Sequence, residues 1–158
     1  MVCSQNCVSN PTLCNFLNSK LFLILVVIFN AIINACAYTI GDVSEQNKAI
    51  EIASTMLKEL DLSPHGKPDQ VTYGTFLKVC RTQMPECPSR TQIIDVVFKK
   101  CMKEGQVGQF VLEQLEAVTT PDKFISLVGR SHTDYMDLPR AWTRNVVEGK
   151  RRRRQRLF

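Results

Sequence analysis

Histidine and cysteine, two side chains that often do chemistry at neutral pH, form no catalytic or metal-binding pattern in this sequence. His65 lies in a Pro-Gly loop and His132 in a polar stretch, and neither has a serine or cysteine partner at a recognisable spacing. The seven cysteines are odd in number, irregularly spaced and without a Cys-x-x-Cys pair, so a zinc site is not predicted. Cys36 and Cys80 fall on apolar helix faces, where a reduced thiol behaves as a small hydrophobe. We therefore predict that the protein is not an enzyme and holds no cofactor or metal.

The strongest electrostatic feature is a run of basic residues at the C-terminal end. The chain of 158 residues has a net charge of +5, and six basic residues with no acid among them lie in residues 150–158. The rest of the chain is therefore near neutral. Such a block is usually disordered and solvated, and it can neutralise phosphates, serve as a nuclear-import signal or bind anionic lipid. We assign phosphate contact to Lys150, Arg151, Arg152, Arg153, Arg154 and Arg156.

A sequence pattern that occurs twice organises the rest of the chain. Residues 26–36 and 70–80 match at an offset of 44 positions. The matched pairs are Val27 with Val71, Phe29 with Tyr73, Ile33 with Leu77 and Cys36 with Cys80. Between the copies, apolar residues in the stretch 47–60 recur at spacings of three and four, which predicts an amphipathic helix. A helix, a second helix, a Pro-Asp break and the first helix again indicate a helical-hairpin repeat, because repeats of about 20 to 50 residues are typical of solenoids.

Two of these stretches resemble the pentatricopeptide repeat proteins, including those of algal or diatom type. One is the Lys-Pro-Asp junction at 67–69, which leads into Val-Thr-Tyr at 71–73, and the other is the helix start at 29–36. The family repeat has about 35 residues, so the longer offset implies insertions, which we place in 38–47 and 62–65. The resemblance implies an all-α fold, a short α-solenoid of antiparallel helical hairpins with C-terminal capping helices and a disordered basic tail.

The resemblance also implies how such a chain would bind RNA. In helical-repeat RNA readers, two or three side chains per repeat read one base of a single strand. These roles fall on Asn30 and Asp69 in the first copy, a combination similar to the one that prefers uridine in the family. Val27 and Val71 would be the apolar residues that sandwich a base. In the second copy the reader position is Gly74, paired with Asp122, and a glycine has no side chain to read a base.

Four segments are expected along the chain. Residues 1–20 form a polar segment that is targeting or disordered, residues 21–128 the repeat domain, residues 129–149 a C-terminal cap and residues 150–158 the basic tail. Further helices are expected over 70–82, over 90–103 with Ser89 as N-cap and Gly105 as C-cap, over 106–118, from Pro121 behind Thr120, and after Leu138-Pro139 around Trp142. We expect Val71 to belong to the apolar stripe of its helix.

The apolar segment 21–38 has three interpretations. The three are a buried first repeat helix, a signal peptide or membrane anchor, and an organelle-targeting segment. Asn30 and Asn34 interrupt its apolar run, so a strict span of 18 or more apolar residues, as a membrane helix needs, is not met.

Our functional expectation is a protein that binds single-stranded RNA in organellar RNA processing, stability or translation. The family resemblance implies a mitochondrial or plastid location, whereas the basic tail alone would favour the nucleus. The main rival is a protein–protein adaptor whose solenoid groove holds a peptide or helix. A membrane-anchored protein is a further alternative.

Overall fold

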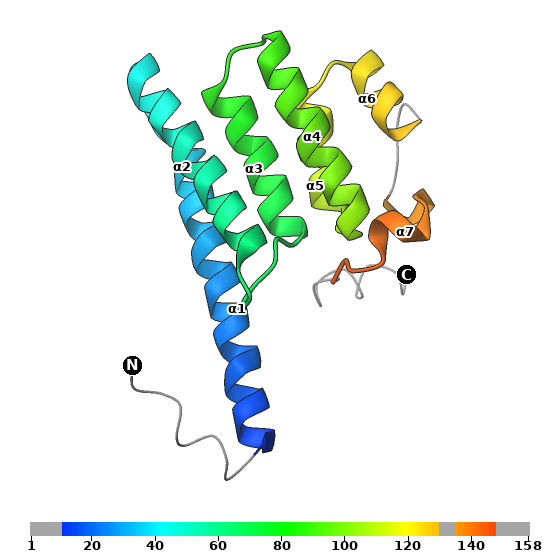
Figure 1. The fold of residues 1–158 in the computed structure, drawn as a ribbon. Helices are drawn as coiled ribbons and strands as arrows, with labels where there is room; N and C mark the ends of the chain where they lie inside the picture. Colours follow the sequence, from blue (N-terminus) through cyan, green and yellow to red (C-terminus); the bar gives the residue numbers. More distant parts are fainter. Residues whose placement is uncertain (1–10, 130–134, 148–158) are drawn as a thin grey trace, which may run out of the picture.

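The computed structural model describes residues 11–129 and 135–147, and within these the chain is all-α, with helices and no strands (Figure 1). The helices are α1 (Pro11–Cys36), α2 (Val43–Leu62), α3 (Gln70–Gln83), α4 (Pro88–Glu104), α5 (Gln109–Val118), α6 (Pro121–Val128), the 3₁₀ helix η1 (Tyr135–Asp137) and α7 (Arg140–Thr143). This confirms the expected all-α class.

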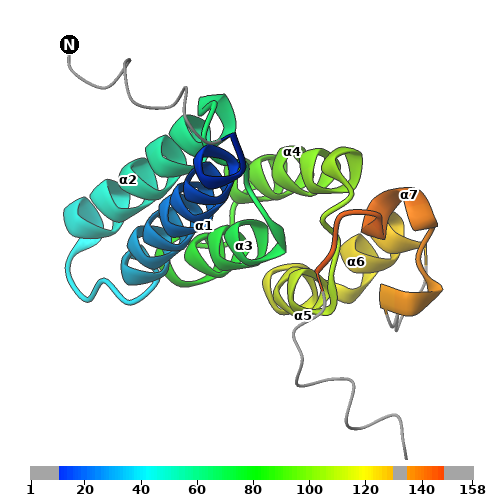
Figure 2. The same ribbon diagram turned by 90° about the horizontal axis from the view of Figure 1, so that it is seen from below.

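The first five helices form two layers. Each runs antiparallel to the one before it (Figure 1), and α1, α3 and α5 lie side by side while α2 and α4 cover them from the other side (Figure 2). Helix α3 is central, since it contacts α1, α2, α4 and α5. Most of its residues are consequently buried, from Thr72 to Leu77 and again at Val79, Cys80 and Gln83. The molecule therefore has a repeat-like helical architecture, with the second copy of the sequence pattern at its centre.

The helix ends follow from local sequence signals. Asp42 caps α2 by accepting a hydrogen bond from the Glu45 amide at 3.0 Å. Thr120 caps α6 with Pro121 in its first turn, as expected, because proline needs no backbone hydrogen bond there. Gly105 ends α4 with a φ of 69°, a left-handed conformation that glycine adopts without a steric penalty.

Three helix starts differ from the expectation. Helix α1 already begins at Pro11, inside the segment expected to be targeting or disordered. It continues without a break through Asn30 and Asn34, which interrupt the apolar run of the sequence. Helix α4 begins at Pro88, because the Cys87 sulfur rather than Ser89 caps it by accepting from the Arg90 amide at 3.4 Å. Helix α5 begins only at Gln109, because the preceding residues form a loop that bonds to the C-terminal segment.

That C-terminal segment covers the open end of α4 and α5. The Val107 amide donates to the Trp142 carbonyl and the Asn145 amide donates to the Gly105 carbonyl, both at 2.9 Å. The Trp142 ring meets Phe98 of α4 edge-on, with ring centroids 6.3 Å apart. Leu138 and Phe124 of α6 are buried in the same core. The layers are thus closed at this end by α6, η1 and α7.

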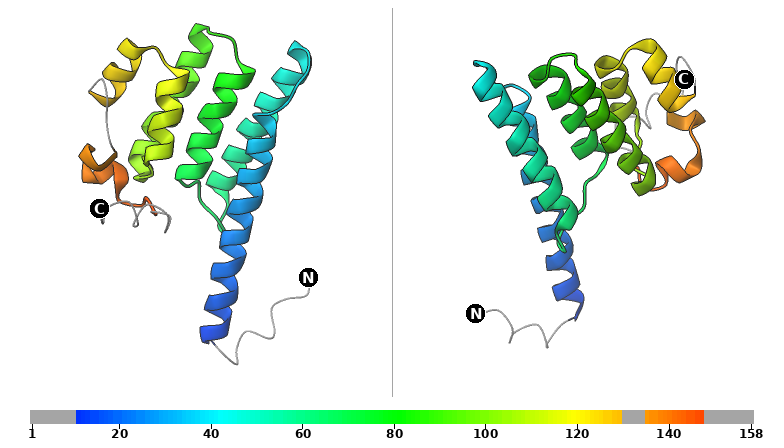
Figure 3. Two further views of the ribbon diagram at one scale, coloured as in Figure 1. Left: turned by 180° about the vertical axis from the view of Figure 1, so that it is seen from behind. Right: turned by 45° about the horizontal axis from the view of Figure 1, so that its top comes forward.

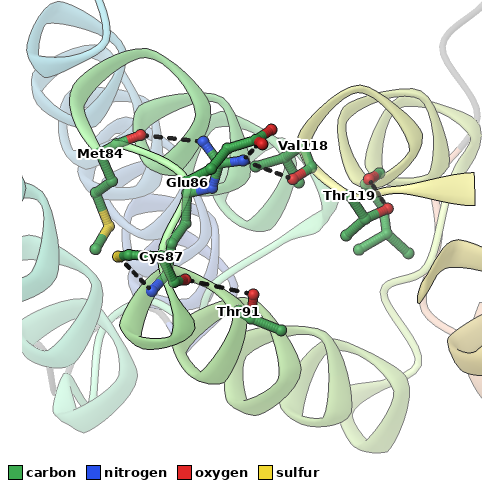
Figure 4. Close-up of polar contacts among 8 residues, drawn as sticks. Met84, Glu86, Cys87, Thr91, Val118 and Thr119 are labelled. Carbon is green, nitrogen blue, oxygen red and sulfur yellow. Dashed lines mark hydrogen bonds and ion pairs between the residues drawn. The ribbon is translucent and has the colours of Figure 1, made fainter. Parts of the chain in front are cut away.

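A polar junction joins the loop between α3 and α4 to the end of α5 (Figure 4). The Arg90 guanidinium donates to the Met84 carbonyl at 3.1 Å and to the Glu86 carboxylate at 3.0 Å, and it lies 3.5 Å from the Val118 carbonyl. Because these partners satisfy a cation that is largely buried, we interpret the cavity of about 330 Å³ beside it as a structural junction.

Cys36 and Cys80 lie in the apolar core, as their positions on apolar helix faces predicted. Cys36, Cys80 and Cys101 are buried and free. Burial raises the pKa of the Cys80 thiol to about 12, and it also raises the pKa of the Cys101 thiol. These thiols are therefore neutral apolar core residues at physiological pH. Within residues 11–129 and 135–147, no helix combines the length and the apolarity needed to cross a bilayer.

Candidate nucleic-acid interface

The two side chains proposed as base readers meet directly. Asn30 comes from the C-terminal half of α1 and Asp69 is the N-cap of α3, and the Asn30 amide nitrogen donates to Asp69 Oδ1 at 3.2 Å. Both side chains are half-buried. The structure thus joins two residues that lie 39 positions apart in the sequence.

A third residue, Thr72, completes this cluster and was not among the expected site residues. Its hydroxyl lies 2.6 Å from Asn30 Oδ1 and 2.9 Å from Asp69 Oδ1, and it can donate its one proton to either oxygen. The Asp69 amide donates to the same hydroxyl at 3.1 Å, and the Thr72 amide donates to Asp69 Oδ1 at 2.8 Å. These last two contacts form a capping box, so Asp69 also stabilises the start of α3.

The cluster keeps some hydrogen-bonding capacity. Among the residues that the structure describes, the second amide N–H of Asn30 and Oδ2 of Asp69 have no hydrogen-bond partner. Together they offer one donor next to one acceptor. Such a pair can bond to the edge of any base, and the preference for uridine is implied by the family resemblance alone.

The two valines expected to sandwich a base are both exposed. Val27 lies one turn before Asn30 on α1 and is 56% exposed, and Val71 lies in the first turn of α3 and is 43% exposed. Of the residues expected in the apolar stripe of α3, Phe76, Leu77 and Cys80 are buried, whereas Val71 is exposed and Thr72 faces α1 instead. Two apolar side chains beside a half-buried polar cluster are compatible with a base-binding slot.

The second copy has no comparable opening, because Phe110 of α5 covers its reader position. A Cβ atom built on Gly74 would lie 2.5 Å from Cε1 of Phe110 and closer still to Cδ1. Gly74 is buried, and the absence of a side chain lets α3 and α5 approach each other. Asp122, the partner expected for this position, is exposed in the first turn of α6.

The end of the described chain is anchored beside the Asn30–Asp69 cluster. Gln70, which lies between Asp69 and Val71 in the sequence, donates from its side-chain amide to the Val147 carbonyl at 2.8 Å. The six basic residues of the tail, Lys150, Arg151, Arg152, Arg153, Arg154 and Arg156, lie outside the described residues. In the sequence their block begins three residues after Val147.

A second surface feature lies on the opposite layer. A mostly apolar groove of about 470 Å³ runs between α2 and α4 with Tyr73 and Phe76 of α3 at its floor. Lys58 and Lys100 line its edges, and Lys100 pairs with Asp61. Cavities of this size hold small ligands or side chains of a partner.

Comparisons of the chain with protein-family models, with curated proteins and with solved structures found no match. The pentatricopeptide resemblance therefore stays a prediction.

Proposed function

We propose that this chain is a short α-solenoid of pentatricopeptide type that binds single-stranded RNA. The observation that carries the proposal is the Asn30–Asp69 contact, which places the two expected reader side chains together across α1 and α3. Val27 and Val71 would hold a base from its two faces, and the half-buried amide and carboxylate would meet its edge.

The affinity would come mainly from the tail. A single base site contributes about 1–3 kcal/mol if it binds like an aromatic stacking site, which is too little for useful affinity alone. Six basic residues that neutralise six phosphates would give a logarithmic salt dependence of about −4 for single strands. The bond from Gln70 to Val147 holds the end of the described chain beside the cluster. By family resemblance, the protein would act in RNA processing, stability or translation in a mitochondrion or plastid.

The experiment is fluorescence anisotropy of the purified full chain with short uridine-rich, adenosine-rich and cytidine-rich RNAs across a salt series. We expect binding with a preference for one base that persists at moderate salt. A matched variant with the six basic tail residues replaced by glutamine keeps the chain length. It should lose affinity for all RNAs and flatten the salt slope, and an unchanged slope would remove the tail from the proposal.

A protein–protein adaptor is the second candidate. Two observations favour it, namely that Phe110 closes the second reader position and that the groove between α2 and α4 is apolar. In the same titration, the absence of binding to any RNA at low salt would favour the adaptor over the RNA reader.

A further inference from the structure

Helix α1 carries an apolar stripe that no described part of the chain covers. Leu21, Ile24 and Ile28 are 56%, 54% and 50% exposed, and Ile32 is 37% exposed. We call these four residues the outer stripe. Their spacings of three, four and four place them along one face of the helix. Ala31 and Ala35, which are also exposed, continue this face with small side chains.

The outer stripe points away from the rest of the molecule. Val26, Ile33 and Cys36 are buried and lie on the opposite side of α1, where α2 and α3 pack. Asn30 lies between these two faces, because it reaches Asp69 at the start of α3. Figure 3 shows α1 at the edge of the molecule, with its N-terminal half extending beyond α2 and α3. The stripe and the candidate base site therefore occupy different faces of the same helix.

The stripe is chemically uniform. No charged residue occurs between Lys20 and Asp42 in the sequence, so this part of α1 presents hydrocarbon without a charge that would select a particular partner. Leu21, Ile24, Ile28, Ala31 and Ala35 follow the alternating three-and-four spacing of a coiled-coil seam. Such a seam is self-complementary, since two copies can interlock their side chains along a two-fold axis.

The other end of the described chain is covered by short elements and presents no long exposed helix. There α6, η1 and α7 cover the core, with Phe124 and Leu138 buried and Trp142 packed against Phe98. An apolar stripe at one end and a capped surface at the other favour a head-to-head arrangement. A contact of this kind is closed, because it uses the same patch on both copies.

The area agrees with a weak but specific dimer. From the exposed fractions, the outer stripe and its neighbours would bury roughly 500 Å² per copy, so the pair reaches the total of about 1,000 Å² that marks the lower limit of biological interfaces. An isolated patch of this size is also at the upper end of what monomers expose. We infer that the outer stripe of α1 binds the same stripe of a second copy of this chain, forming a two-fold symmetric dimer.

Analytical ultracentrifugation of the full chain over a wide micromolar range tests this inference. The wild-type protein should shift from the monomer mass of 17.9 kDa to twice that mass as concentration rises. Ile24→Glu and Ile28→Glu should weaken the association by at least tenfold, since each pair would bury two carboxylates. Val96→Glu is the matched control, because Val96 is an exposed apolar residue of α4 that lies in the groove on the other layer. Circular dichroism checks that each variant is folded.

The outcomes separate the occupants of the stripe. A wild-type chain that stays monomeric at all concentrations would overturn the inference, as would a dimer that Val96→Glu breaks and Ile28→Glu leaves intact. Flotation with neutral phosphatidylcholine vesicles tests whether a lipid surface, rather than a second copy, binds the stripe. A monomer that floats through the stripe, and loses flotation on Ile28→Glu, would assign the surface to lipid.

Discussion

The close approach of α3 and α5 at Gly74 allows a prediction whose sign can be worked out. In Gly74→Ala the new methyl group would lie about one bond length too close to the Phe110 ring. Alanine gains about 1 kcal/mol over glycine in a helix interior. Overpacking of a tight core contact costs about 1–3 kcal/mol. The ring of Phe110 is half-buried and could shift only by losing contacts, so we expect a net loss of about 1 kcal/mol.

A double-mutant cycle by urea denaturation measures this effect. In a Phe110→Ala background the obstacle is gone, so Gly74→Ala should change sign and stabilise the protein by about 1 kcal/mol. The coupling energy between the two positions should therefore be about 2 kcal/mol. Stabilisation by Gly74→Ala in the wild-type background would refute the close contact, and it would reopen the second reader position.

Three further predictions concern cysteine and tyrosine side chains. Between the ordinary thiol pKa of 9.0 and the folded value of about 12 for Cys80, the unfolded chain binds fewer protons than the folded one, so stability should fall by about 1.4 kcal/mol per pH unit from this thiol alone. Urea midpoints measured from pH 8 to 11 check this, and a flat profile would contradict it. The Tyr73 hydroxyl is buried without a hydrogen-bond partner in the described chain, so Tyr73→Phe should be neutral or stabilising by up to about 1 kcal/mol in the same assay, whereas a loss above about 1 kcal/mol would imply a missing partner. Cys87, which is partly exposed, should react with a thiol reagent in the native state well before Cys80, as peptide mapping of the labelled protein would show, and equal rates would argue against the burial of Cys80.

The parts of the fold that could be predicted from the sequence are those that local signals determine. The spacing of apolar residues in 47–60 indicated α2, and Thr120-Pro121 and Gly105 gave one helix start and one helix end correctly. Thr72 was missed as a site residue, although the Asp-x-x-Thr spacing from Asp69 is a capping-box pattern that could have been used.

The remaining contacts depend on packing between distant segments. The position of Phe110 over Gly74 follows from how closely α3 and α5 approach, which no local pattern reports. The hydrogen bond from Gln70 to Val147 joins residues 77 positions apart, and the sequence around neither residue predicts it. The exposure of Val71 likewise depends on which side of α3 faces α1. The candidate base site could therefore be predicted as a list of residues but not as a geometry.

The central claim is that Asn30 reads a base, and the most direct test compares two asparagines of α1. Asn30→Ala removes the amide that meets Asp69, and Asn34→Ala removes an exposed amide one turn further along the same helix. The measurement is the ratio of dissociation constants for uridine-rich and cytidine-rich RNA at moderate salt. Our account predicts that Asn30→Ala reduces this ratio several-fold while Asn34→Ala leaves it unchanged. An equal loss of affinity for both RNAs in Asn30→Ala, with the ratio preserved, would contradict it and leave Asn30 a purely structural link between α1 and α3.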